Sequence, residues 1–192
     1  MRAEELTAEF GIAGVLDFVE TEHGLVKAAI LLDDVTAELY LQGAQVTAWQ
    51  PLDERPVLFT SPKSAFAPGK AIRGGIPIVF PWFGANRHTP TAPPHGFART
   101  VTWHLNGVEA AGSGSLTLTL SLGDGDVGSP FWPEPFRAIY TVTWEYRAVA
   151  RAWSRKMGRA ELGGRLRPAG KPRAIRGMLW VLPLISALAH NR

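Results

Sequence analysis

The stretch SLTLTLSL, residues 115–122, places leucine at every second position with a hydroxyl residue between. Because successive side chains of a β-strand point to opposite faces, this alternation predicts a strand with one apolar and one polar face. Asp33-Asp34 and Gly43 are turn signals between other apolar runs. Short runs rich in β-branched, leucine and aromatic residues predict further strands at 25–32, 35–42, 45–50, 76–80, 101–105 and 138–146. This spacing favours an all-β antiparallel sandwich, and no helical periodicity is evident before residue 147.

Prolines interrupt the strand pattern in the middle of the chain. Nine of the fifteen prolines lie between Pro51 and Pro94. Proline fixes φ and cannot donate a backbone hydrogen bond, so it is excluded from central strands. We therefore expect this region to cross a sheet as ordered loops that contain only short strands.

Composition restricts the compartment and the class of protein. The chain has 192 residues, 46% of them hydrophobic, which suits a single globular domain with a sizeable core. Cysteine is absent, so we expect a reducing cytoplasmic compartment and no disulfide framework. The N-terminal residues do not resemble a signal peptide, and no apolar run reaches the roughly 18 residues of a membrane span, so no membrane partner is expected.

Charge is distributed unevenly along the chain. Residues 147–192 hold 11 lysines and arginines and the single acid Glu161, whereas residues 1–146 hold 9 bases and 16 acids. Within the acidic part, no Asp or Glu occurs between Arg55 and Val108. The basic residues of that stretch are Arg55, Lys63, Lys70, Arg73, Arg87 and Arg99. The excess predicts an anion site, and the alternative is a chance run of solvated basic residues.

The segment GKAIRGG, residues 69–75, combines cations with unobstructed backbone. Lys70 and Arg73 supply positive charge, and Gly74-Gly75 would let a ligand approach backbone N–H groups without an intervening Cβ. The segment is not a P-loop, because the order G-x-x-x-x-G-K-[ST] is absent. It therefore predicts an anion-binding loop of another kind.

The segment PPHGFAR, residues 93–99, adds an imidazole and a guanidinium. Arg99 can hold a phosphate through two parallel hydrogen bonds, and His95 can exchange protons with sugar oxygens near neutral pH. The alternatives are a structural ion pair for the arginines and a capped loop histidine. Aromatic residues nearby could stack on a sugar ring or belong to the core; these are Phe80, Trp82, Phe83 and Phe97.

Four motifs together resemble the N-terminal half of the hexose-6-phosphate mutarotases, or glucose-6-phosphate 1-epimerases, of the aldose 1-epimerase superfamily. They are GAQVTAWQP, VLFTSPKSAF, GKAIRGGIPIVFPWFG and PPHGFARTVTWHL, and the resemblance covers residues 12–146. It implies a galactose-mutarotase-like β-sandwich, truncated here, and an isomerase that interconverts the anomers of a phosphorylated hexose without cofactor or metal. It also implies that Arg73 and Arg99 bind the substrate and its phosphate, and that His95 lines the site. Lys70 and Gly74 complete the predicted substrate-binding set.

The C-terminal residues depart from that family. Mutarotation needs a base for the anomeric hydroxyl and an acid for the ring oxygen, and the family supplies them as a histidine and a glutamate from its C-terminal half. Here the later histidine is His190 and the later acid is Glu161, neither in a family context, so the catalytic residues stay unassigned. We divide the chain into a sandwich part, 1–146, and a basic tail, 147–192, which we interpret as the product of a disrupted reading frame.

Two alternative functions follow from this departure. Without an acid/base pair the chain would be a non-catalytic sugar-phosphate-binding module. A genuine basic appendage would instead bind nucleic acid, with steep salt dependence, and this alternative is the less favoured of the two.

Overall fold

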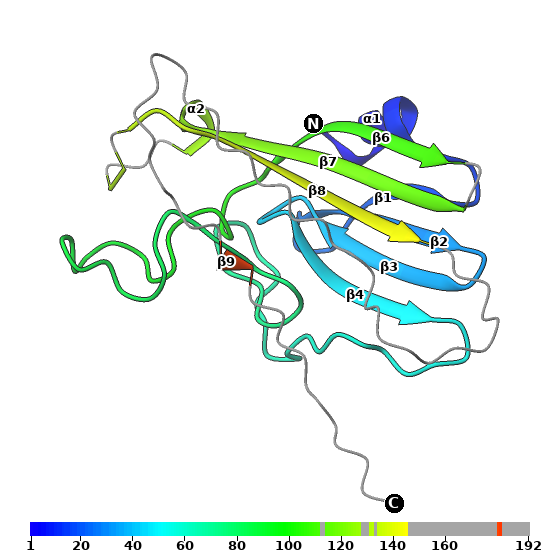
Figure 1. Cartoon of the computed structure of the whole chain (residues 1–192), viewed down its shortest axis with the longest axis horizontal. Coiled ribbons are helices and arrows are strands. Elements are labelled where there is room, and N and C mark those ends of the chain that lie inside the picture. The colour runs from blue at the N-terminus through cyan, green and yellow to red at the C-terminus, as the bar shows by residue number, and fades with distance from the viewer. Residues whose placement is uncertain (112–113, 128–130, 133, 146–179, 182–192) are drawn as a thin grey trace, which may run out of the picture.

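Two antiparallel β-sheets form the framework of the computed structural model (Figure 1). The structure describes residues 1–111, 114–127, 131–132, 134–145 and 180–181. The sheets carry apolar side chains on the faces that meet, and one continuous core lies between them. The expected all-β sandwich is therefore confirmed.

The first sheet has the strand order β1-β2-β3-β4, and each neighbouring pair is antiparallel. Asp33-Asp34 form the two-residue connection between the second and third strands, as the sequence predicts. The side chains of Ile30, Ala37 and Leu39 on the central strands are almost fully buried. The strands are β1 (Leu16–Glu20), β2 (Val26–Leu32), β3 (Val35–Tyr40) and β4 (Gln45–Pro51).

The second sheet contains β6 (His104–Ala111), β7 (Ser115–Gly123) and β8 (Arg137–Glu145), in that order. The alternation of β7 works as predicted, because its four leucines are completely buried. Leu118 lies opposite Val142 on this inner face. On the outer face the hydroxyl oxygens of Thr117 and Thr143 are 2.9 Å apart.

Two short segments complete the strand inventory of the described residues. β5 (Ile78–Val79) lies in the proline-rich region and pairs antiparallel with β9 (Trp180–Val181). Ile78 is fully buried in the shared core. The predicted division of the chain at residue 147 stays a prediction, since the rest of the tail lies outside the described residues.

A helix precedes the first sheet. It was not predicted from the sequence, where no helical periodicity is evident before residue 147. α1 (Ala3–Phe10) is capped by the preceding residue Arg2, whose backbone N–H donates to Glu5 Oε2 at 2.9 Å. The helix has two turns and buries only Ala3 and Leu6, so its apolar residues are too few to establish a helical period. A second, four-residue helix, α2 (Asp124–Val127), follows β7.

Two strand predictions also need correction. The sequence pattern did not predict β1, which is short and buries only two of its five side chains, Leu16 and Phe18. It placed a strand at residues 101–105, whereas β6 begins at His104. The preceding residues pair instead with the connection between β3 and β4, because Gly43 N–H donates to Val101 O at 2.8 Å and Trp103 N–H donates to Leu41 O at 2.9 Å. The chain therefore passes along this connection immediately before it enters β6.

The helices of the described residues are short. Neither has the length and hydropathy required to cross a membrane.

Substitutions on the two faces of β7 should differ clearly in their effect on the free energy of unfolding. Leu118→Ala should lower the free energy of unfolding by about 2 to 5 kcal/mol, because it removes buried methyl groups and leaves a cavity. Thr119→Ala, the control on the opposite face of the same strand, should cost less than about 1 kcal/mol. Urea denaturation of both variants measures the difference, and equal losses would contradict this orientation of β7.

Candidate functional site

The predicted site residues lie in the long connection between β4 and β6, residues 52–103, which runs beside the sheets as irregular loops (Figure 1). Its Gly-Gly pair is held against neighbouring backbone. Gly74 has φ +106°, and a Cβ at this position would lie 2.2 Å from Phe59 O. Gly75 has φ +64°, and its Cβ would lie 2.2 Å from Val46 O. The glycines therefore let two parts of the chain approach each other, and a ligand contact at Gly74 stays a prediction.

Two buried glutamines hold this loop: Gln42 lies in the connection between β3 and β4, and Gln45 is the first residue of β4. Gln42 Nε2 donates to Lys70 O at 2.8 Å, and its Oε1 accepts from Gly69 N–H at 2.8 Å. Gln45 is fully buried, and its Nε2 donates to Ile72 O at 3.1 Å and to Gly74 O at 2.6 Å. Gln45 belongs to the GAQVTAWQP motif, but its role was not predicted from the sequence. The available signal was an amide side chain inside an apolar run, where a buried polar group needs partners.

Arg73 and Arg99 are close enough to repel each other. Burial and the positive charge of Arg73 both lower the pKa of Arg99 from its ordinary value, burial having the larger effect. Arg99 Nη2 donates to Pro94 O at 2.8 Å, whereas its buried Nε has no hydrogen-bond partner among the described residues. No described Asp or Glu forms an ion pair with either arginine, so the structural ion pair considered above is not found in this part of the chain.

His95 lies beside Arg99 and is held by the backbone of Gly84. The backbone N–H of His95 donates to Gly84 O at 2.7 Å, and the backbone N–H of Gly84 donates to Nδ1 of the His95 ring at 3.2 Å. Because Nδ1 accepts this bond, the neutral imidazole carries its proton on Nε2. Burial and then the charge of Arg99 lower the pKa of His95, which favours this neutral form. The ring of Phe83 meets the imidazole edge to face at 4.9 Å.

The structure separates the remaining predicted residues. The Lys70 side chain is exposed, and its predicted role in substrate binding stays a prediction. Phe80 and Phe97 belong to the core, in line with the core alternative for these aromatics. Phe83 is 53% exposed, and Trp82 is half-buried with its Nε1 donating to Pro93 O at 3.0 Å. Of the four aromatics, Phe83 therefore presents the most surface to a ligand at His95.

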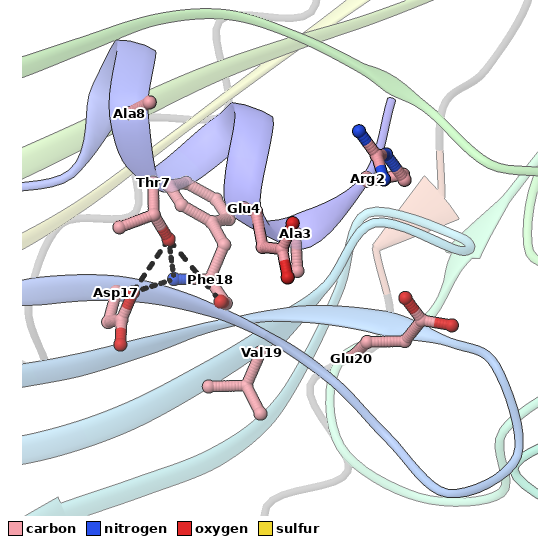
Figure 2. Close-up of a pocket in the computed structure, with 9 residues that line it drawn as sticks. All are labelled: Arg2, Ala3, Glu4, Thr7, Ala8, Asp17, Phe18, Val19 and Glu20. Atoms are coloured by element: carbon pink, nitrogen blue, oxygen red, sulfur yellow. Dashed lines mark hydrogen bonds between the residues drawn. The ribbon is translucent and has the colours of Figure 1, made fainter.

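A hollow lies away from these residues, between α1 and β1 (Figure 2). Thr7 Oγ1 donates to Asp17 Oδ1 at 2.6 Å and accepts from Phe18 N–H at 3.0 Å. The hydroxyl thereby supplies a partner for an N–H of β1, an edge strand of the first sheet. None of the predicted substrate-binding residues lines this hollow.

The described residues contain no group of three or more His, Asp or Glu side chains that could hold a metal ion. A substrate-binding role for the cluster of Arg73, His95 and Arg99 stays a prediction.

Residues 30–146 match the sequence profile of the family described as aldose 1-epimerase. The chain belongs to the aldose 1-epimerase family. The match spans the β3–β4 connection, residues 69–75, which carry Arg73 and are called the arginine loop, and residues 93–99, which carry His95 and are called the histidine loop. It also agrees with the mutarotase resemblance carried by the sequence motifs.

Individual relatives support this membership. A protein of Escherichia coli K12 named "Putative glucose-6-phosphate 1-epimerase" is 36% identical over 124 residues. A protein of the plant Cenchrus ciliaris with the same name is 42% identical over 91 residues. The crystal structure of "a putative mutarotase (YeaD)" from Salmonella typhimurium superimposes with a TM-score of 0.65 at 30% identity and covers 71% of this chain. The sandwich is therefore galactose-mutarotase-like.

The matched region is a minor part of these relatives. The chain spans 38% of the length of the E. coli relative, 27% of the C. ciliaris relative and 45% of the Salmonella structure. His190 and Glu161, to which no catalytic role was assigned, lie outside the described residues, as does most of the basic segment considered for nucleic-acid binding.

Gly96 provides a test of how tightly the histidine loop is packed. Its φ is +71°, and an added Cβ would lie 1.9 Å from Phe80 O, so Gly96→Ala requires backbone movement next to His95. Gly69→Ala is the matched control, because Gly69 has φ +72° but no atom within 4 Å of the added Cβ. We expect Gly96→Ala to lower the free energy of unfolding by at least about 2 kcal/mol more than the control, measured in urea. Equal losses would show that the loop yields freely.

The charge of Arg99 beside His95 predicts that removing this arginine will change the pKa of His95. Arg99→Gln should raise the pKa of His95 because it removes the positive charge beside the ring, whereas Arg99→Lys retains the charge and should raise it less. Titration of the imidazole by NMR measures both values. The neutral ring is favoured in the folded state, so this contribution to stability is lost as the pH falls below about 6.5 and through the lowered pKa of His95. An unchanged pKa in Arg99→Gln would contradict the inferred proximity.

Proposed function

We propose that Arg73, His95 and Arg99 bind a phosphorylated hexose, and that the chain is a hexose-6-phosphate 1-epimerase or a binding-competent part of one. The main support for this proposal is the pair of neighbouring guanidinium groups, which have no carboxylate partner among the described residues. Two unpaired cations, one of them half-buried, repel each other until an anion lies between them. A phosphate dianion supplies that charge together with oxygens that accept several hydrogen bonds.

The proposed roles divide between phosphate and sugar. Arg73 is exposed and Arg99 is half-buried, so both can reach a ligand from the solvent side. Their guanidinium groups would donate to phosphate oxygens. Neutral His95 would donate from Nε2 to a sugar oxygen, and exposed Phe83 would lie against an apolar face of the ring.

The proposed reaction opens and closes the sugar ring. A base removes the proton of the anomeric hydroxyl while an acid protonates the ring oxygen, and reclosure from the other face gives the second anomer. Within the described residues no carboxylate forms an ion pair with His95. The described cluster therefore supports substrate binding, and the same observation favours a non-catalytic sugar-phosphate-binding module as the second candidate.

Binding is tested first, with isothermal titration calorimetry on monodisperse protein. Glucose 6-phosphate should bind at least about 10-fold more tightly than glucose, because the phosphate supplies the charge-assisted hydrogen bonds. Arg73→Ala should weaken glucose 6-phosphate binding about 10-fold or more. Lys63→Ala is the matched control, since it removes an exposed cation from the same long connection and should change affinity less than about 2-fold. Equal losses of affinity in both variants would show that binding depends on the overall positive charge of this connection and not on Arg73 in particular.

Catalysis is tested separately, by NMR exchange between the anomers of glucose 6-phosphate. Exchange above the uncatalysed rate that is lost in Arg73→Ala supports the epimerase. Binding without exchange, in protein shown to be folded, supports the binding module instead. Absence of both would overturn the proposed function.

A further inference from the structure

The backbone on either side of Arg73 is fixed by a buried side chain from the first sheet. Gln45 donates both hydrogens of its amide, one to Ile72 O and one to Gly74 O, and these carbonyls flank Arg73. The Gln45 side chain is completely buried, and its Oε1 has no partner among the described residues. A buried, partly unsatisfied amide is costly compared with an apolar side chain of the same shape. Core packing therefore gives no reason for a glutamine at this position.

Arg73 itself is held through its own backbone groups. Its N–H donates to Ser64 Oγ at 3.1 Å, and its carbonyl oxygen accepts from Ser61 N–H at 2.8 Å. Together with Gln45, these bonds restrain the loop from the sheet side and from the neighbouring turn. The side chain of Arg73 remains exposed, so the restraint acts on its attachment point and leaves the guanidinium free to meet a ligand.

We propose that Gln45 and Ser64 are positioning residues, which hold the backbone of Arg73 so that its guanidinium lies beside that of Arg99. The inference rests on the proposed phosphate-binding role of these arginines. Repulsion between two like charges drives an unrestrained loop away from Arg99 when no anion is bound. A loop held in place by hydrogen bonds keeps the two cations together before the ligand arrives, so less binding energy is lost in ordering the loop.

Gln45→Met tests the buried bond donor, because methionine has a similar shape and length but cannot donate to Ile72 O and Gly74 O. The affinity of the folded protein for inorganic phosphate and for glucose 6-phosphate should fall about 5-fold or more. Gln50→Met is the matched control: Gln50 lies on the same strand, is exposed and donates to Glu54 O at 3.0 Å. This control should retain the wild-type affinity. Far-UV circular dichroism and thermal unfolding establish the folded fraction of each variant.

Ser64→Ala gives a second test at a partly exposed position, where the substitution is not expected to prevent folding. Loss of the acceptor for Arg73 N–H should weaken binding of both ligands about 3-fold or more. Ser64→Thr retains the hydroxyl and should restore most of the lost affinity. A role limited to stability would lower the melting temperature of the alanine variant and leave the affinity of the folded fraction unchanged.

The outcomes separate this inference from the proposed function. If the wild-type protein binds neither phosphate nor glucose 6-phosphate, the proposed function fails, and the inference fails with it. If the wild type binds, Arg73→Ala binds about 10-fold or more weakly, and both Gln45→Met and Ser64→Ala bind as tightly as wild type, the arginine site stands and the positioning role is overturned. Weakened binding in Gln45→Met and Ser64→Ala, with recovery in Ser64→Thr, supports it.

Discussion

One constraint dominates this structure: the backbone N–H and C=O groups of a long irregular connection must find hydrogen-bond partners. Residues 52–103 contain only the two-residue strand β5, so most of their carbonyls and N–H groups cannot pair within a regular sheet. Side chains supply many of the missing partners. Gln42 and Gln45 hold the arginine loop, and Trp82 and Trp103 donate to carbonyls farther along the connection. The connection is thereby attached to the sandwich, and the candidate site depends on that attachment.

The same connection brings like charges together, which is unfavourable without a ligand. The charge of Arg73 contributes to the lowered pKa of Arg99, and the described residues contribute no carboxylate that offsets this repulsion. Structural arginine pairs ordinarily acquire acidic neighbours, since buried charge without a partner is costly. The stretch from Arg55 to Val108 contains no acid at all. Stability is thus reduced locally at a place where an anion would restore it.

Family membership and chain coverage lead to different conclusions. Membership of the aldose 1-epimerase family follows from a match to more than half of the chain and agrees with the sandwich topology. The chain spans 38% of the E. coli relative, so the activity of that protein's full length does not transfer by similarity alone. The described part brings two guanidinium groups and an imidazole near one another, and substrate binding there is the proposed role of this cluster.

The sequence by itself determined the strands with strong alternation and the charge character of the site. The leucines of β7 and the turn at Asp33-Asp34 are local signals, because strand orientation and hairpin formation depend on neighbouring residues. α1 and β1 were missed since each buries only two side chains, which is too few to establish a period. Only the tertiary structure decided that the charge of Arg73 acts on Arg99 and that Gln45 holds the carbonyls on either side of Arg73. Both relations join residues distant in sequence, and they depend on how the irregular connection folds against the sheet.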